Sequence, residues 1–395
     1  MSPSLRRHQK RPVDAGDRFP SQPLDAPLLE VENVKTSFRT ERGLVRAVDG
    51  VSFSLERGKT LGVVGESGSG KTVLSRSIMG LLPKKNVVRE GRICFEGKEI
   101  GDASSATMRQ LWGTQMAMVF QDPMTSLNPV LKIGRQINES LLYHLDISRN
   151  YANELSLALL SSVGIPEPER RLKEYPHQLS GGMRQRVMIA IAIACGPKLL
   201  FADEPTTALD VTVQAQILDL LQDQQRERYM AMILVTHDLG VVAGRADDIA
   251  VMYAGRIVEK APTSVLFHEM RHPYTEALVR SIPKLANPSH TRLDMIVGRP
   301  PDLVNPPTGC KFSPRCPYVQ ERCRTEEPPL LDADAPGHSF RCWYPVGTPE
   351  GRAALERNRA EGHLAAAVTT VASDTNGASG NAPAAGDAAP TTEGV

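Results

Sequence analysis

The sequence predicts an α/β protein with a parallel sheet at its centre. Four apolar runs have the continuous hydrophobicity of strands that are buried on both faces, and helical patterns separate them. The runs lie at 60–64, 116–119, 199–203 and 232–235. The first run leads into a glycine-rich loop and then into a helix-like stretch from about Thr72 to Leu82. This strand–loop–helix unit predicts that the sheet carries a phosphate-binding site.

The glycine-rich loop has the phosphate-binding pattern G-x-x-x-x-G-K-T. Its glycines let successive backbone N–H groups point at one anion, and the following helix directs the positive end of its dipole there. Lys71 can reach the outer phosphates of a nucleotide, and the Thr72 hydroxyl can ligate Mg²⁺. The predicted nucleotide-binding residues are Gly65, Ser67, Gly68, Ser69, Gly70, Lys71 and Thr72. Alone, this motif predicts only that a nucleoside triphosphate is bound.

The composition excludes several classes of protein. With 395 residues, 41% hydrophobic and 23% charged, the chain can form two domains or one large domain with appendages. A net charge of +1 and an aromatic content of 5% disfavour nucleic acid as a partner. No apolar stretch is long enough to span a bilayer. Residues 1–27 lack the apolar core of a signal peptide, so we expect a disordered arm and a cytosolic protein.

Two further layers are predicted around the parallel sheet. Alternating apolar residues at 28–38 and 47–55, with a third strand at 91–95, predict an antiparallel β subdomain. The stretch 122–178 is largely helical in pattern and predicts an inserted helical subdomain. A last hairpin is expected to turn at Ala254-Gly255.

Polar residues follow three of the predicted parallel strands. Gln121 lies just past the strand at 116–119, Asp203 and Glu204 end the next strand, and His237 follows the last. Ligands bind at the carboxyl ends of parallel strands, so these side chains are candidates for an active site. Asp203 is placed to hold Mg²⁺ directly or through water, Glu204 to polarise an attacking water, and His237 to contact a γ-phosphate. Taken singly, each could also be an ordinary residue at a strand end.

A second cluster of backbone N–H groups is predicted at Ser180-Gly181-Gly182, where a helix begins that runs through Cys195. A helix N-terminus of this kind can bind phosphate. The cluster lies more than a hundred residues beyond the phosphate loop. It is therefore either a second phosphate site or a simple N-cap without a ligand.

In this order the motifs resemble those of the ATP-binding-cassette (ABC) ATPases, over about residues 28–262. The resemblance implies that Glu204 is the catalytic base, Gln121 the glutamine-loop residue and His237 the switch histidine. The implied ligands of the Mg²⁺ ion are Thr72, Gln121 and Asp203. Because every expected catalytic group is present, the resemblance implies a protein that hydrolyses ATP with Mg²⁺ as cofactor.

The same resemblance implies a head-to-tail dimer that encloses ATP between two such domains. Leu179–Gly182 resembles the family signature and Ala208-Leu209-Asp210 the D-loop. Ser180 and Gly182 would then serve the nucleotide of the partner. The implied nucleotide-binding residues outside the phosphate loop are Phe38, which would stack on adenine, Ser180, Gly181, Gly182 and Asp210.

Residues 263–345 resemble the C-terminal extension of ATPase subunits from oligopeptide, dipeptide and nickel importers. Tyr175-Pro176-His177-Gln178, before the signature, resembles the same group. The implied function is ATP-driven import of di- or oligopeptides at the cytoplasmic face of the membrane. An importer of nickel or another solute and a non-transport ABC ATPase are the alternatives. The implied partners are a second ATPase subunit, identical or related, two permease subunits gripped by the helical subdomain, and an extracytoplasmic solute-binding protein.

Four cysteines of the extension have the spacing C-x₅-C-x₆-C-x₁₈-C. The close C-x₂₋₄-C pairs of zinc sites are absent from it, and disulfides are disfavoured in the cytosol. These cysteines either hold a [4Fe–4S] cluster, as in some members that the chain resembles, or stay reduced. They are Cys310, Cys316, Cys323 and Cys342. Residues 346–395 are rich in Ala, Gly and Thr; the stretch 352–367 allows a short helix, and the rest predicts a disordered tail.

Overall fold

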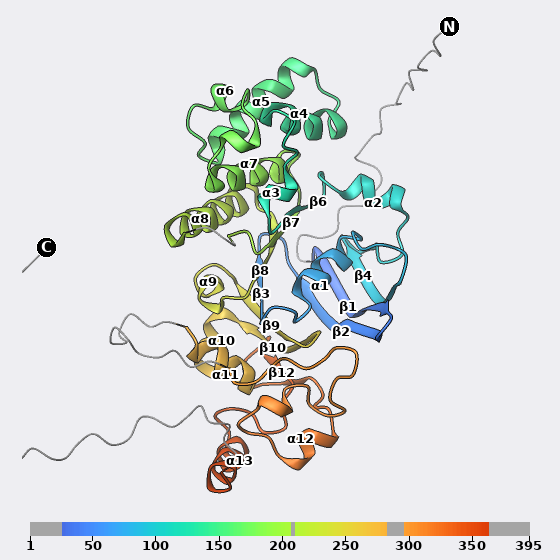
Figure 1. The fold of residues 1–395 in the computed structure, drawn as a ribbon, viewed down its shortest axis with the longest axis vertical. Helices are drawn as coiled ribbons and strands as arrows, with labels where there is room; N and C mark the ends of the chain where they lie inside the picture. Colours follow the sequence, from blue (N-terminus) through green and yellow to red (C-terminus); the bar gives the residue numbers. More distant parts are fainter. Residues whose placement is uncertain (1–25, 207–209, 283–295, 363–395) are drawn as a thin grey trace, which may run out of the picture.

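The structure, a computed structural model, describes residues 26–206, 210–282 and 296–362. The described chain is elongated, with a helical subdomain at one end and the C-terminal extension at the other (Figure 1). The predicted N-terminal arm, except for its last two residues, lies outside the described ranges. Within these ranges, no helix combines the length and the apolar character that crossing a bilayer requires.

An eight-stranded sheet forms the centre of the molecule, in the order β11-β12-β10-β9-β3-β8-β7-β6. Five neighbouring strands of this sheet run parallel to one another, which confirms the predicted parallel core. They are β9 (Asp248–Tyr253), β3 (Thr60–Val64), β8 (Ala231–Thr236), β7 (Leu199–Asp203) and β6 (Met116–Val119). In β7, Leu199 and Phe201 enter one hydrophobic core, while Leu200 and Ala202 enter the other. The strand reads as a continuous apolar run because both of its faces are buried.

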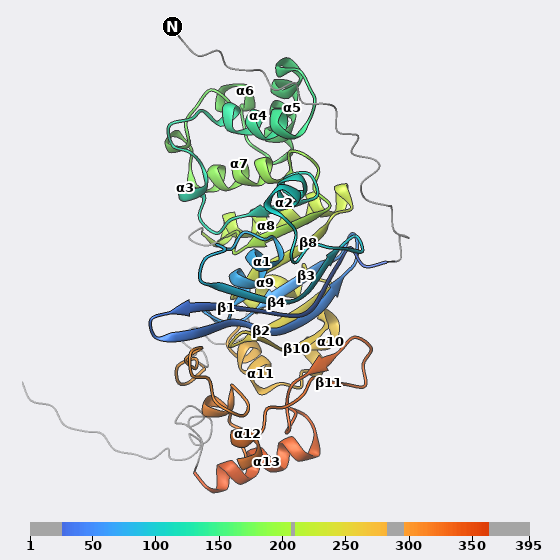
Figure 2. The same cartoon turned by 90° about the vertical axis from the view of Figure 1, so that its right-hand side faces the viewer.

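The predicted antiparallel β subdomain covers one face of this sheet (Figure 2). Its order is β2-β1-β4-β5, and the neighbouring strands are antiparallel. The strands are β1 (Leu29–Thr40), β2 (Gly43–Leu55), β4 (Val87–Phe95) and β5 (Lys98–Glu99). Two helices share the core between the sheets, α1 (Lys71–Ile78) and α2 (Ser105–Leu111). Leu74 and Ile78 of α1 lie fully inside it, which places the phosphate loop between the two sheets.

The predicted helical subdomain is also present. Ile137 and Leu141 of α4 pack in one core with Ala152 and Leu160 of α5. Its elements are α3 (Pro123–Ser126), α4 (Ile133–His144), α5 (Arg149–Ser162), α6 (Pro168–Arg171) and the 3₁₀ turn η1 (Pro176–Gln178). Helices over the second face of the central sheet share this core. They are α7 (Gly181–Ile193), α8 (Val211–Arg228) and α9 (Leu239–Ala243).

The central sheet continues into the extension, which the sequence did not indicate. Strand β10 (Arg256–Pro262) forms the predicted hairpin with β9 and also pairs with β12, where Glu259 lies opposite Phe340. Strands β11 (Leu331–Asp332) and β12 (Ser339–Phe340) have two residues each, too few to show an alternating pattern. The remaining elements of this region are α10 (Thr263–Glu269), α11 (Pro273–Arg280), η2 (Ser313–Arg315) and α12 (Glu321–Thr325).

Pro349–Ala360 of the predicted tail forms helix α13, which overlaps the stretch 352–367 where the sequence allows a short helix. Thr348 caps this helix by accepting a hydrogen bond from the Gly351 N–H at 3.1 Å. Ala354 is fully buried, and the Asn358 amide donates to carbonyl groups of the extension. Tertiary contacts therefore order a helix whose own sequence is mostly polar. Residues 363–395 lie outside the described ranges.

Candidate nucleotide-binding site

The phosphate loop joins β3 to α1 with a backbone that only glycine adopts readily. Gly65 has φ 155° and Gly70 has φ 102°. A Cβ atom on Gly70 would lie 2.1 Å from the Ala47 carbonyl oxygen, so no other residue fits there without moving the backbone. The Lys71 ammonium donates to the carbonyls of Gly65 at 2.8 Å and Glu66 at 3.0 Å. Lys71 thereby lies within the loop, and burial lowers its pKa, opposed by Glu204, Asp203 and Glu66.

Two oxygen atoms at the end of the loop suit a magnesium ion. The Thr72 hydroxyl donates to the Asp203 carboxylate at 3.0 Å, and Asp203 is almost fully buried. Hydroxyl and carboxylate oxygens are the ligands that Mg²⁺ takes in nucleotide sites. Burial raises the pKa of Asp203, and the hydrogen bond from Thr72 opposes this effect. A cation at this position would relieve the cost of burying the carboxylate.

Two polar side chains from other strand ends meet at Glu204. The Gln121 amide donates to one Glu204 carboxylate oxygen at 2.9 Å, and Nδ1 of His237 lies 3.5 Å from the other. Glu204 has φ 46°, and its N–H donates to the Val235 carbonyl at 2.9 Å, which fixes the turn after β7. The structure therefore brings together the three residues that the sequence placed at separate strand ends.

The loop and these side chains line one open cleft of about 780 Å³. The size suits a small-molecule ligand. Its lining residues are Ala47, Glu66, Ser67, Gly68, Gly70, Lys71, Thr72, Val73, Gln121, Glu204, His237 and Pro300. Phe38 is not among them; it lies in β1, paired with Val45 and Val87. Its contact with adenine remains a prediction, whereas Ala47 and Pro300 line the cleft without any motif to indicate them.

The signature segment lies outside this cleft, at the N-terminus of α7. The Ser180 hydroxyl caps the helix by accepting from the Met183 N–H at 3.3 Å. Asp210 caps α8 in the same way by accepting from the Val213 N–H at 2.9 Å. The cleft around the phosphate loop is not lined by Ser180, Gly181, Gly182 or Asp210. Ala208 and Leu209, the other D-loop residues, lie outside the described ranges.

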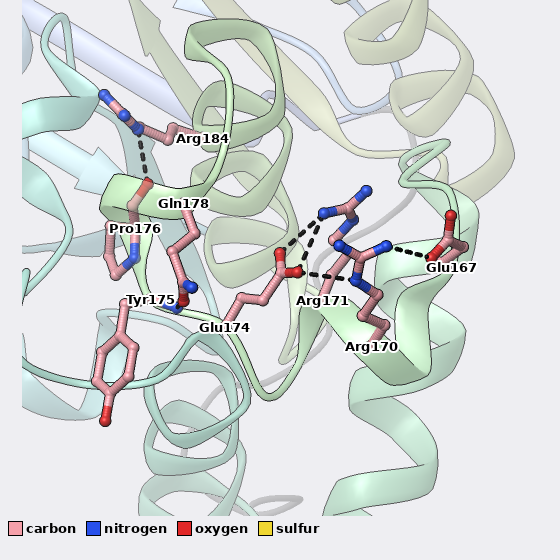
Figure 3. Close-up of polar contacts among 8 residues, drawn as sticks. All are labelled: Glu167, Arg170, Arg171, Glu174, Tyr175, Pro176, Gln178 and Arg184. Atoms are coloured by element: carbon pink, nitrogen blue, oxygen red, sulfur yellow. Dashed lines mark hydrogen bonds and ion pairs between the residues drawn. The ribbon is translucent and has the colours of Figure 1, made fainter.

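Polar contacts hold the segment that precedes the signature (Figure 3). Arg184 of α7 donates to the Pro176 carbonyl at 2.7 Å, which ties η1 to the signature helix. The Gln178 side chain accepts from the Tyr175 N–H at 2.8 Å. Glu174 accepts hydrogen bonds from Arg171 and Arg170. The position of Ser180 is therefore set by the helical subdomain as well as by its own helix.

The four cysteines of the extension line a common cavity of about 10 Å³. Burial raises the pKa of all four thiols, that of Cys310 to about 11. Backbone hydrogen bonding favours the thiolate form of each of the four and so opposes this rise in pKa. As the side chains stand, no group of three or more His, Cys, Asp or Glu residues in the described ranges has the arrangement of a metal site.

The fold and the cleft together define an ATPase of the ATP-binding-cassette class. A family model described as "ABC transporter" matches residues 48–207, and one described as "Oligopeptide/dipeptide transporter, C-terminal region" matches residues 258–323. The oligopeptide transport ATP-binding protein OppD of Bacillus subtilis is 49% identical over 80% of this chain and 88% of its own length. The dipeptide transport ATP-binding protein DppD of Escherichia coli is 49% identical over 81% of this chain and 97% of its own. The chain belongs to the oligopeptide/dipeptide branch of the ABC transporter family.

Solved structures agree with this assignment. The ATP-binding cassette MJ0796, described as dimeric, in a post-hydrolysis state and bound to ADP and Pi, matches with a TM-score of 0.54 and 25% identity. The match covers 60% of this chain and 98% of that one. The protein is thus an ABC-type transport ATPase that uses ATP and Mg²⁺.

Proposed function

We propose that this chain is the subunit whose ATP hydrolysis drives import of di- or oligopeptides through a multisubunit transporter at the cytoplasmic face of the membrane. The observation that carries the proposal is similarity to peptide transport ATP-binding proteins along about four-fifths of the chain, extension included. In this proposal residues 28–262 form the ATPase, with its helical subdomain at about 122–178, and 263–345 form the extension.

In the proposed reaction, different residues of the cleft bind the nucleotide, hold the metal ion and activate water. The loop from Gly65 to Thr72 and the Lys71 ammonium bind the triphosphate, and Thr72, Gln121 and Asp203 hold Mg²⁺, which supplies charge neutralisation when bound. Glu204 accepts the proton of the attacking water, and His237 contacts the γ-phosphate. The contacts of Gln121 and His237 with Glu204 keep these groups within reach of one another.

We further propose that Ser180, Gly181, Gly182 and Asp210 act on the nucleotide of a second ATPase subunit. Their place outside the cleft and the dimeric state of a similar cassette support this. ATP would then stabilise the closed dimer by mass action, and hydrolysis would remove that support. Two permease subunits and an extracytoplasmic solute-binding protein complete the proposed complex.

Finally, we propose that the four extension cysteines hold a [4Fe–4S] cluster. Their common cavity and the backbone hydrogen bonding that favours the thiolate form of all four support this, since a cluster is held by thiolates. Anaerobically purified protein should be brown and contain iron and labile sulfide. Cys316→Ser should lose both, whereas Cys195→Ser should not; iron-free wild-type protein would refute the cluster.

The function is tested by uptake into whole cells that carry Glu204→Gln in place of the native residue. Labelled di- and oligopeptides and, in parallel, nickel are supplied. Selective loss of peptide uptake is expected. Loss of nickel uptake alone would replace peptides with nickel as the solute, and unchanged uptake of both would contradict the proposal. Glu90→Gln, a change on an exposed strand residue, is the matched control.

A further inference from the structure

A buried arginine of the extension forms hydrogen bonds with a residue of the phosphate loop. Arg315, on η2, donates two hydrogen bonds to the Glu66 carboxylate, at 2.6 Å and 2.9 Å. Its side chain is only 3% exposed, while that of Glu66 is 27% exposed. The two residues are 249 positions apart in the sequence, and no motif connects them.

The surroundings of Arg315 fix it in one place. It also donates to the Tyr253 hydroxyl and to the backbone carbonyls of Ile296 and Val297. Burial disfavours its charge, but the bonds to Glu66 and Tyr253 outweigh burial and raise its pKa above the usual range. A bidentate arginine held by so many acceptors is a rigid partner for a carboxylate.

Glu66 is an unfavourable residue to find beside bound ATP. It is the second residue of the phosphate loop and lines the nucleotide cleft. Its negative charge acts on Lys71, which is needed for the phosphates. An unpaired carboxylate there would repel the triphosphate and compete for the lysine. Its N–H is also engaged, because it donates to the Tyr274 hydroxyl at 2.8 Å.

The extension contacts the other side of the loop as well. The Lys311 ammonium, on the same segment as Arg315, donates to Asp49 at 2.8 Å and to the Ala254 carbonyl at 3.1 Å. The next residue, Gly255, donates to the Ser69 carbonyl of the phosphate loop at 2.9 Å. The loop is therefore held between two contacts that begin on one short segment of the extension.

We propose that Arg315 is a positioning residue for nucleotide binding, which neutralises and fixes the Glu66 carboxylate beside the ATP phosphates. The extension thereby takes part in the ATP site. This inference rests on ATP binding at the phosphate loop and is independent of which solute the transporter carries.

The test measures binding of AMP-PNP with Mg²⁺ to the purified full chain by titration calorimetry. Arg315→Gln should weaken binding about tenfold, which corresponds to about 1.4 kcal/mol. Adding Glu66→Gln to that variant should restore most of the affinity, because the unpaired charge is gone. Rescue by the second substitution separates the charge effect from a merely structural one.

Arg42→Gln is the matched control, since it breaks another arginine–carboxylate pair between the extension and the ATPase, that of Arg42 with Asp302. Its affinity should equal that of the wild type. Unchanged affinity in Arg315→Gln, or no recovery in the double variant, would overturn the inference.

Two further variants keep the test decisive. If melting curves show that Arg315→Gln does not fold, Arg315→Lys replaces it; it should bind a few-fold more weakly, and Glu66→Gln should again restore binding. Normal affinity of the lysine variant would likewise count against the inference. Lys71→Ala tests the nucleotide site itself. Normal AMP-PNP binding by this variant would refute the site. Loss of binding by Lys71→Ala together with normal binding by Arg315→Gln would refute only the role of Arg315.

Discussion

Single residues of the cleft show how binding chemistry opposes stability. Asp203 is buried next to Thr72, and burial raises the pKa of its carboxyl. An acid with a raised pKa is more stable protonated, so its ionisation at neutral pH costs folding free energy. The carboxylate proposed to hold Mg²⁺ therefore lowers the folding stability of the protein when no ligand is bound.

This gives a prediction for Asp203→Asn. The folded pKa of Asp203 lies above its unfolded value, so stability is highest below the unfolded pKa and is lost as the pH rises through the folded one. Asparagine keeps an acceptor for Thr72 and does not titrate. In nucleotide-free protein, Asp203→Asn should melt no lower than the wild type at pH 7, and its relative advantage should shrink in acid.

The variant should also fail to hydrolyse ATP. Asp102→Asn, an exposed control, should change neither property. A clear drop in the melting temperature of Asp203→Asn at pH 7, measured by calorimetry, would show that the carboxylate stabilises the fold instead.

At the scale of elements, tertiary packing can fix a helix that the sequence only allows. Helix α13 has exposed residues on most of its surface but buries Ala354 completely. The side chain of Asn358 donates to the carbonyls of Pro317 and Val319 near α12. The helix is therefore part of the extension and not of a disordered tail.

Two neighbouring alanines of α13 provide a direct test. Ala354→Leu should lower the free energy of unfolding by about 1–3 kcal/mol, because the extra volume has no space at a fully buried position. Ala353→Leu, exposed one residue earlier, should stay within about 0.5 kcal/mol of the wild type. Urea unfolding of both variants makes the comparison. Equal stabilities would mean that α13 does not pack on the extension in solution.

At the scale of the whole molecule, the extension and the ATPase share one sheet and one buried polar group. Glu259 of β10 is fully buried and accepts from the N–H groups of Arg271 and His272 at 2.5 Å and 3.0 Å. Nε2 of His338, from the loop before β12, lies 2.8 Å from the same carboxylate. This carboxylate therefore joins three separate segments at the point where β12 continues the sheet.

Glu259→Ala should consequently loosen the extension. The substitution leaves the N–H groups of Arg271 and His272 and the buried His338 ring without their acceptor, which should cost about 3–5 kcal/mol. Limited proteolysis should then cleave the extension before the ATPase core. Glu269→Ala, at an exposed position on α10, is the control and should resist cleavage like the wild type. Uniform cleavage of the Glu259 variant would show that the extension has no boundary of its own.

The sequence predicted every parallel strand that carries a site residue, the antiparallel layer and the helical subdomain. It could do so because these features depend on neighbours along the chain: a strand buried on both faces is apolar throughout, and an alternating strand has one exposed face. The phosphate loop was equally clear, because all of its binding atoms lie within eight residues. The contact of Phe38 with adenine stays a prediction, since the region around it has no local pattern.

The sequence by itself therefore determined the groups of the site: a phosphate loop, a carboxylate that we propose holds Mg²⁺, and Glu204 with its neighbours. Only the tertiary structure decided how the C-terminal extension is used. Pro300 at the cleft, Arg315 on Glu66, and the meeting of four cysteines each join residues that are far apart in sequence. Such contacts depend on how separate elements pack against each other. The sequence of each contributing segment therefore shows no periodic pattern that would predict them.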